Sequence, residues 1–253
     1  PDVFADGEAV IAAFEAWIRR AAEERPDGAP PVVLVANTGD PGVATLVERL
    51  ASPGWGGLVV RTAVDPDPSA ELEVGGHITA ADPDGTTMTV DVGDLGSFAV
   101  RLPTAGRHNA SNALGVIGAC VAAGVEPEAA IAGLATFPGV GRRLERKGEA
   151  AGVVVYDDYG HHPTAIRETL RAVRQREPGR RIWAVYEPLT YHRTAALLDA
   201  FADVLADADA VAIAQIWAGR DPDTTIASAA GLAEAVAHRN PAITAAPPGT
   251  VEE

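Results

Sequence analysis

The second half of the sequence repeats one pattern three times: a short apolar run precedes a longer segment with helical spacing of apolar residues. The runs occupy residues 153–156, 181–186 and 209–216, and the helical segments occupy residues 163–174, 194–205 and 228–238. A strand, a helix and then a parallel strand form the repeating unit of α/β folds. Residues 139–253 are therefore predicted to form a Rossmann-like domain.

The first half has a different pattern, in which helical and strand-like segments alternate before antiparallel ribbons begin. Helices are expected at residues 4–24, 43–50, 109–123 and 127–134, and strands at residues 32–36, 58–61, 71–80, 86–92 and 97–102. Asp-Gly between two alternating runs, at residues 84–85, is a strong hairpin signal. Residues 1–138 are thus predicted to form an α/β domain with antiparallel ribbons, and the domain boundary is placed near residue 138.

The charge of the chain excludes two classes of partner. Its 35 acidic residues outnumber its 20 basic residues, which gives a net charge of −15. Such a surface repels phosphate backbones and anionic headgroups, so neither nucleic acid nor a membrane is an expected partner. The single cysteine, Cys120, permits no internal disulfide and no cysteine-based metal site, which suits a cytoplasmic protein.

The first motif, GRHNASN at residues 106–112, lies where a strand-rich region turns into a helix. His108 and Asn109 can cap the backbone N–H groups of that helix, which is a purely structural role. The same side chains can also present hydrogen bonds to the edge of a planar ligand such as a nucleobase. The motif alone leaves both interpretations open.

The second motif, GVGRR at residues 139–143, falls in the joint between the two predicted domains. Adjacent arginines are unusual in so acidic a chain, and a guanidinium group suits bidentate recognition of a phosphate or a carboxylate. Taken alone, however, the motif is explained at least as well by a solvated pair of surface arginines.

The third motif, DDYGHHP at residues 157–163, directly follows a predicted parallel strand. In open α/β folds ligands bind at the carboxyl ends of the strands. Two carboxylates and two imidazoles at this place can position sugar hydroxyls, bind a cation or hold an amine. The simpler alternative makes Asp157 and Asp158 turn residues and His162 a helix cap. No metal site is predicted, because the usual zinc-ligand spacings are absent.

The fourth motif, YEPLTYHRT at residues 186–194, again lies between a predicted strand and a predicted helix. It is therefore expected beside the third motif. Arg193 can clamp a carboxylate there. A surface arginine near the start of a helix is the equally simple alternative.

In this order the four motifs resemble those of the Mur ligase family, and within it the enzymes that add L-alanine. These carry G-x-H-N-x-x-N, F-x-G-V-x-R-R, D-D-Y-A-H-H-P-x-x-I and approximately F-Q-P-H-x-Y-x-R-T. The sequence has GRHNASN, FPGVGRR, DDYGHHPTAI and YEPLTYHRT at the corresponding places. The resemblance is strong over residues 106–226 and looser over residues 1–105, which are similar to part of the family's central domain.

The resemblance implies an ATP-dependent ligase of peptidoglycan precursor synthesis that joins L-alanine to UDP-N-acetylmuramate through an acyl phosphate. ATP and Mg²⁺ are the implied cofactors, with the Mg²⁺ ligands mainly outside these residues. His108 and Asn109 would face the adenine, Arg143 would reach the ribose or the phosphates, and Asp158 would hold the ribose hydroxyls.

The same resemblance implies an amino-acid site formed by Tyr159, His161 and Arg193. Arg193 would pair with the carboxylate of the incoming amino acid. His161 would be the catalytic residue, because a neutral imidazole can accept a proton from the amine.

The sequence departs from the family in several places. It contains no G-x-x-x-x-G-K-[ST] phosphate-binding loop and begins with Pro1, so we expect part of a longer enzyme that does not catalyse ligation by itself. Glu187, Leu189 and Thr190 stand where the L-alanine-adding enzymes have Gln, His and Arg. The pair Glu187-Pro188 is similar to the corresponding sequence of the murein tripeptide ligase of cell-wall recycling. That activity is the first alternative to the addition of L-alanine.

A second alternative is a non-catalytic nucleotide-binding relative that never had a phosphate-binding loop. An unrelated NAD-binding Rossmann protein is disfavoured, because no G-x-G-x-x-G follows a predicted strand.

Overall fold

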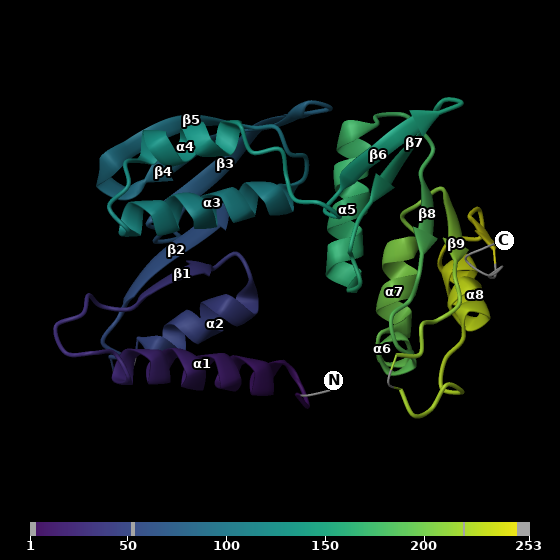
Figure 1. Ribbon diagram of the computed structural model, residues 1–253, viewed down its shortest axis with the longest axis horizontal. Helices are drawn as coiled ribbons and strands as arrows, with labels where there is room; N and C mark the ends of the chain where they lie inside the picture. Colours follow the sequence, from purple (N-terminus) through teal and green to yellow (C-terminus); the bar gives the residue numbers. More distant parts are fainter. Residues whose placement is uncertain (1–3, 52–53, 220, 247–253) are drawn as a thin grey trace. The chain divides into compact units, whose positions relative to one another are not determined.

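The computed structural model describes residues 4–51, 54–219 and 221–246. The chain divides into two compact units between Pro138 and Gly139. We call residues 3–138 the first unit and residues 139–253 the second unit; they are coloured purple to teal and green to yellow in Figure 1. Separate clusters of buried apolar side chains lie within the two units.

The sheet of the first unit has five strands in the order β1-β2-β3-β4-β5 (Figure 1). The strands are β1 (Val33–Asn37), β2 (Leu58–Val64), β3 (Val74–Asp82), β4 (Gly85–Val92) and β5 (Gly96–Leu102). The first three are parallel, and β3, β4 and β5 are antiparallel. The predicted hairpin is confirmed, with Asp82 opposite Gly85. The antiparallel ribbons continue the parallel layer directly, because β3 pairs with β2 on one edge and with β4 on the other.

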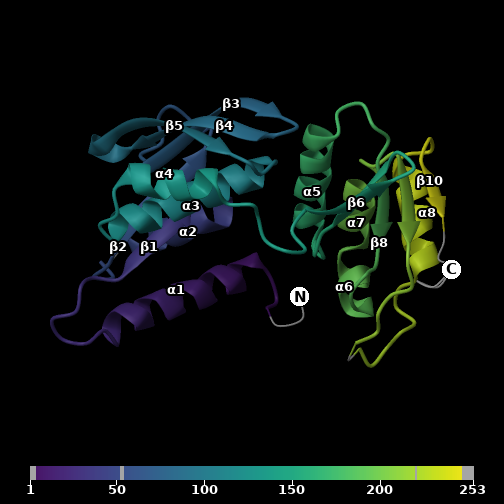
Figure 2. The ribbon, with the colours of Figure 1, turned by 45° about the horizontal axis from the view of Figure 1, so that its top comes forward.

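Four helices and one 3₁₀ turn complete the described part of the first unit. They are α1 (Gly7–Glu23), α2 (Pro41–Leu50), η1 (Gly93–Leu95), α3 (Arg107–Ala122) and α4 (Pro127–Ala135). Figure 2 shows α3 and α4 side by side on one face of the sheet. Leu114 and Ile117 of α3 are fully buried in the core formed there. A Cβ atom at Gly118 would lie 2.9 Å from Val60, so glycine permits this close packing of α3 on β2.

The second unit contains two separate sheets. The parallel sheet has the order β10-β9-β8, and β6 and β7 form an antiparallel pair. The strands are β6 (Glu145–Ala150), β7 (Val153–Asp157), β8 (Trp183–Tyr186), β9 (Ala210–Ile213) and β10 (Thr244–Ala246). The helices are α5 (Pro163–Arg176), α6 (Tyr191–Ala196), α7 (Leu198–Leu205) and α8 (Ala229–Arg239). Helix α7 packs between α5 and α8, and Phe201 and Leu232 are fully buried in that core (Figure 1).

Two details of the second unit differ from the sequence-based prediction. The strand at residues 153–156 was expected to join the parallel sheet, but β7 pairs with β6 instead. Strand β6 escaped prediction because its charged sequence, ERKGEA, is largely solvent-accessible and its register shifts at Gly148. The helix expected at residues 194–205 is broken at Leu197, whose φ of −118° and ψ of 20° end α6 before α7 begins.

No helix in the described ranges combines the length and the apolar character needed to cross a bilayer.

Candidate functional site

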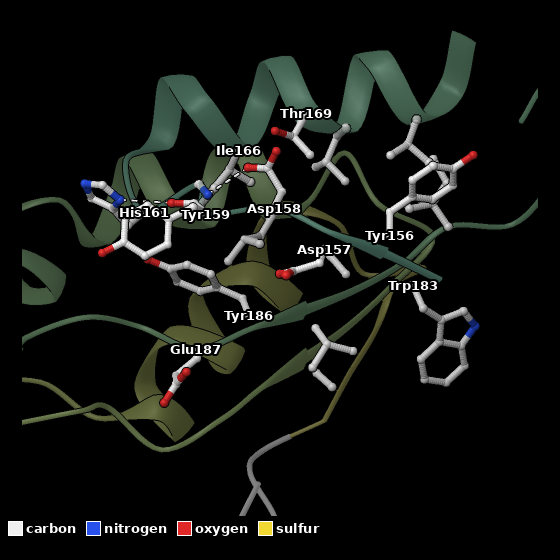
Figure 3. Close-up of a pocket in the computed structure, with 18 of the residues that line it drawn as sticks. Tyr156, Asp157, Asp158, Tyr159, His161, Ile166, Thr169, Trp183, Tyr186 and Glu187 are labelled. Carbon is white, nitrogen blue, oxygen red and sulfur yellow. Dashed lines mark hydrogen bonds between the residues drawn. The ribbon is translucent and has the colours of Figure 1, made fainter. Parts of the chain in front are cut away.

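A cavity of about 690 Å³ lies in the second unit between β7 and β8 (Figure 3). These two strands do not pair with each other in the described part of the chain, and residues of both line the cavity. The apolar part of the lining includes Val154, Ile166, Leu170, Val173, Ile182 and Ala184. The polar part lies towards the carboxyl ends of the strands and includes Arg142, Asp157, Asp158, Tyr159, His161 and Glu187. The third motif thus lines the cavity at the end of β7, although β7 does not belong to the parallel sheet that the sequence predicted for it.

Asp158 holds a turn in place. Its Oδ2 atom accepts a hydrogen bond from the backbone N–H of Leu144 at 2.8 Å, and its Oδ1 atom accepts one from Gly160 at 2.7 Å. The carboxylate therefore fastens the second motif to the end of β7. Asp157 is placed differently, since its Oδ2 lies 3.5 Å from Nε of Arg142.

The second motif presents its arginines to an aromatic ring. The Cζ atoms of Arg142 and Arg143 lie 4.9 and 5.7 Å from the centroid of the Tyr159 ring. The backbone of this turn is strained, because Arg142 and Leu144 have φ values of +57° and +49°. Glu145 supports it by accepting a hydrogen bond from the backbone N–H of Arg142 at 2.8 Å. That N–H, and then the ammonium group of Lys147, lower the pKa of the Glu145 carboxyl.

The two adjacent histidines have different surroundings. His161 Nδ1 lies 3.0 Å from the carbonyl oxygen of Tyr159, and the two rings meet edge to face at 5.3 Å. A neutral His161 that donates from Nδ1 keeps its Nε2 lone pair available to accept a proton. His162 instead caps α5, since its Nδ1 accepts from the backbone N–H of Thr164 at 3.3 Å. Burial, and then the nearby Arg193 guanidinium and His161, lower the pKa of His162.

Arg193 of α6 is a cation without an acidic partner among the residues that the structure describes. Its charge acts on the rings of His162 and Tyr186. The structure therefore brings the fourth motif to the third, as the sequence predicts. Tyr186 received no role from the sequence. The available signal was the tyrosine standing where the approximate family motif has phenylalanine.

His108 and Asn109 lie in the first turn of α3, in the first unit. Gly106, with φ +95° and no side chain, is the N-cap residue, so Asn109 is not the helix cap that the structural interpretation suggested. Asn109 instead donates from Nδ2 to the carbonyl oxygen of Ala105 at 2.7 Å. The preceding Arg107 bonds Asp65 and the carbonyl oxygen of Val64, which fastens the start of α3 to the end of β2.

Asp157 and Asp158 of the cavity are already engaged by other groups of the protein. Within residues 4–51, 54–219 and 221–246, no three His, Cys, Asp or Glu side chains gather closely enough to hold a metal ion. Asp157 faces Arg142, and both oxygens of Asp158 accept backbone N–H groups.

Comparison with known proteins places these features in a family. Residues 142–251 match the model of the Mur ligase, glutamate ligase domain. A UDP-N-acetylmuramate–L-alanine ligase of Mycobacterium sp. (strain JLS) is 36% identical over 93% of this chain, which corresponds to 47% of the relative. The chain thus spans about half the length of the curated relatives that it matches.

Solved structures agree in fold. The UDP-N-acetylmuramate–alanine ligase of Thermotoga maritima matches with a TM-score of 0.62 and 20% identity, over 82% of this chain and 42% of that one. The folylpolyglutamate synthase of Mycobacterium tuberculosis, solved with ADP, matches with a TM-score of 0.65 and 20% identity, over 96% of this chain and 50% of that one. With its second unit matched by the family model and 93% of its length aligned to a ligase of this kind, the chain belongs to the Mur ligase family.

Proposed function

We propose that the chain is part of an ATP-dependent ligase that joins L-alanine to UDP-N-acetylmuramate in the cytoplasm. The observation that carries this proposal is the guanidinium of Arg193, which has no acidic partner among the described residues. Its charge acts on Tyr186, which lines the cavity together with Tyr159 and His161. A cation without an acidic partner calls for an anionic ligand, and a neutral imidazole nearby suits an amine that must lose a proton. A free amino acid has both groups.

The proposed reaction has two steps. A carboxylate oxygen of the sugar substrate takes the γ-phosphoryl group of ATP, which gives an acyl phosphate and ADP. The amine nitrogen of L-alanine then attacks the acyl carbon, the bond from that carbon to the phosphate oxygen breaks, and phosphate leaves. Nε2 of His161 accepts the proton that the nitrogen loses, while Arg193 holds the carboxylate of L-alanine.

The residues proposed to bind the nucleotide differ from those proposed to bind L-alanine. Arg143 is proposed for the ribose or the phosphates, because its guanidinium is held against the Tyr159 ring rather than by an acidic residue. Asp158 is proposed for the ribose hydroxyls through lone pairs that its two backbone hydrogen bonds leave available. His108 and Asn109 are proposed for the adenine.

A second candidate is the murein tripeptide ligase activity. Glu187 lines the cavity and has no ion pair with the residues that the structure describes. A carboxylate there would favour an amino substrate with a further positive charge. A non-catalytic nucleotide-binding protein remains the third candidate.

The test uses a complete ligase that contains this chain. Arg193→Ala should raise KM for L-alanine about tenfold or more, at about 1.4 kcal/mol per decade, with little change in KM for ATP. Asp158→Ala should weaken the binding of ATP more than the binding of L-alanine. Arg171→Ala is the matched control, because Arg171 is an exposed arginine of α5 that pairs with Glu168. An unchanged KM for L-alanine in Arg193→Ala would remove the proposed amino-acid site.

The 253-residue chain provides a second test. Because its sequence has no phosphate-binding loop, we expect it to bind ATP weakly and to release no phosphate from it. Robust ATP turnover by the purified chain would contradict this expectation, and calorimetry with a phosphate-release assay measures both quantities.

A further inference from the structure

Tyr186 has a hydroxyl group that the packing of the protein does not use. It is the last residue of β8, and its ring is buried against Phe201 with 5.4 Å between the centroids. Phenylalanine fills the same space, and the approximate family motif has phenylalanine at this place. The hydroxyl forms no hydrogen bond with any residue that the structure describes. The hydroxyl keeps access to the cavity that Tyr186 lines, so it can donate a hydrogen bond to a ligand bound there.

The hydroxyl belongs to the cavity. Tyr186 lines it together with Tyr159, and in Figure 3 the hydroxyl ends of both rings point towards the carboxyl ends of β7 and β8. This is the end at which the sheets carry their polar side chains. A ligand bound there would therefore meet the phenol oxygen of Tyr186 without any change in the fold.

The charges around Tyr186 select the kind of ligand. Burial raises the pKa of the Tyr186 phenol, while the Arg193 guanidinium opposes this shift, so the phenol remains a protonated donor at neutral pH. Arg193 offers further donors and has no acidic partner among the described residues. A group that contacts both side chains must accept hydrogen bonds and gains most if it is negatively charged.

We infer that the Tyr186 hydroxyl recognises the carboxylate of the amino substrate, to which it donates a hydrogen bond beside Arg193. This inference rests on the proposed function, and it adds a specificity-determining residue that the motifs do not assign. A neutral donor on β8 supplies a contact to the carboxylate in addition to that of Arg193.

The experiment compares two tyrosines of the same cavity in the 253-residue chain. Tyr186→Phe removes only the inferred contact. Tyr156→Phe is the matched control, because Tyr156 also lines the cavity but donates its hydroxyl to Glu177 at 2.8 Å. The dissociation constants of L-alanine and L-alaninamide, which lacks the carboxylate, are measured by NMR titration, together with the melting temperature of each variant.

We expect Tyr186→Phe to weaken L-alanine binding about tenfold or more, the effect of losing a hydrogen bond to a charged group. Its dissociation constant for L-alaninamide and its melting temperature should both stay unchanged. Tyr156→Phe should change the dissociation constant of L-alanine by less than about twofold relative to the parent chain, since the Tyr156 hydroxyl already has a partner. A fall in melting temperature that accompanied the loss of binding would indicate a structural role and overturn the inference.

Other outcomes separate the inference from the proposed function. Equal L-alanine binding by the parent chain and Tyr186→Phe would overturn the inference alone. Failure of the parent chain to bind L-alanine, or equal binding of L-alaninamide, would overturn the inference. The proposed function is tested separately by the effect of Arg193→Ala on KM for L-alanine in the complete ligase. Inorganic phosphate that displaced L-alanine from the parent chain but not from Tyr186→Phe would reassign the hydroxyl to a phosphate group and overturn the carboxylate assignment.

Discussion

The two units use similar elements in opposite ways. In the described part of the first unit every strand joins one sheet, and Val90 of β4 is completely buried. In the second unit β7 and β8 remain apart, a cavity lies between them, and Val185 of β8 is 78% exposed. Strands that pair produce a closed core, whereas strands that stay apart leave an apolar cavity with polar groups at its end. The second unit therefore contains a cavity whose lining combines apolar and polar side chains.

The largest expected difference concerns two buried leucines, one in each unit. Leu114→Ala should destabilise the first unit by about 3–5 kcal/mol, because it leaves a closed void beneath Gly76. Leu205→Ala should cost about 2–3 kcal/mol, because Leu205 lines the existing cavity and its removal enlarges that space instead of creating an isolated void. Urea unfolding followed by resolved NMR signals of each unit measures both values. Equal losses would remove the distinction between a closed and an open core.

A second pair of substitutions compares the strands themselves. Val90→Thr in β4 should destabilise by about 1–3 kcal/mol, because it buries a hydroxyl with no partner. Val185→Thr in β8 should change stability by less than about 0.5 kcal/mol, since this side chain is already in contact with solvent. Chemical denaturation of the two variants checks the difference. A large loss from Val185→Thr would show that this position is covered in solution.

The smallest effect concerns an ion pair at the edge of the second unit. Asp209 accepts hydrogen bonds from the Arg174 guanidinium and the Ile182 N–H, which hold its pKa below the usual range. A carboxyl group whose pKa is lowered on folding stabilises the fold at pH values above its unfolded-state pKa of about 4. This stabilisation is lost as the pH falls through the pKa of the folded state. Asp209→Asn should therefore cost less than about 1 kcal/mol at pH 7, because the pair is solvated.

The pH dependence provides the check on that prediction. The difference in stability between Asp209→Asn and the parent chain should shrink towards zero as the pH falls below about 4. In the first unit, Asp82 beside Arg101 has its pKa lowered in the same way, so Asp82→Asn should show the same sign. A stability difference that grew as the pH fell would contradict the lowered carboxyl pKa in the unit concerned.

The sequence predicted the elements of the fold better than their pairing. Period-two alternation and the Asp-Gly turn identify the hairpin of β3 and β4, because both signals are local. Whether β7 pairs with β8 depends on contacts between distant segments, and no pattern within residues 153–157 reports it. The cavity follows from that missing pairing, so it could not be predicted either.

The candidate site shows the same limit. The order of the motifs indicated that Arg193 would lie near the third motif, on the premise that the two motifs follow consecutive strands of one parallel sheet. That premise was wrong, because β7 and β8 belong to different sheets, although residues of both motifs line one cavity. The hydrogen bonds that Asp158 accepts from Leu144 and Gly160 could not be predicted from the sequence. A carboxylate just before a turn can accept hydrogen bonds from a ligand or from the backbone, and the sequence does not distinguish the two. Tyr186 was missed because a tyrosine at the end of a strand is usual in a core.

The left-handed backbone of Arg142 has a consequence for anyone who wishes to engineer this protein. Glycine adopts a φ of +57° without strain, so Arg142→Gly would relieve about 1 kcal/mol or more at this turn. A search for thermostable variants would therefore favour glycine at this position. The same change would take a guanidinium away from the Tyr159 ring and from Asp157. Heat resistance and the present lining of the cavity are in competition at this residue, so stabilising substitutions should be sought elsewhere.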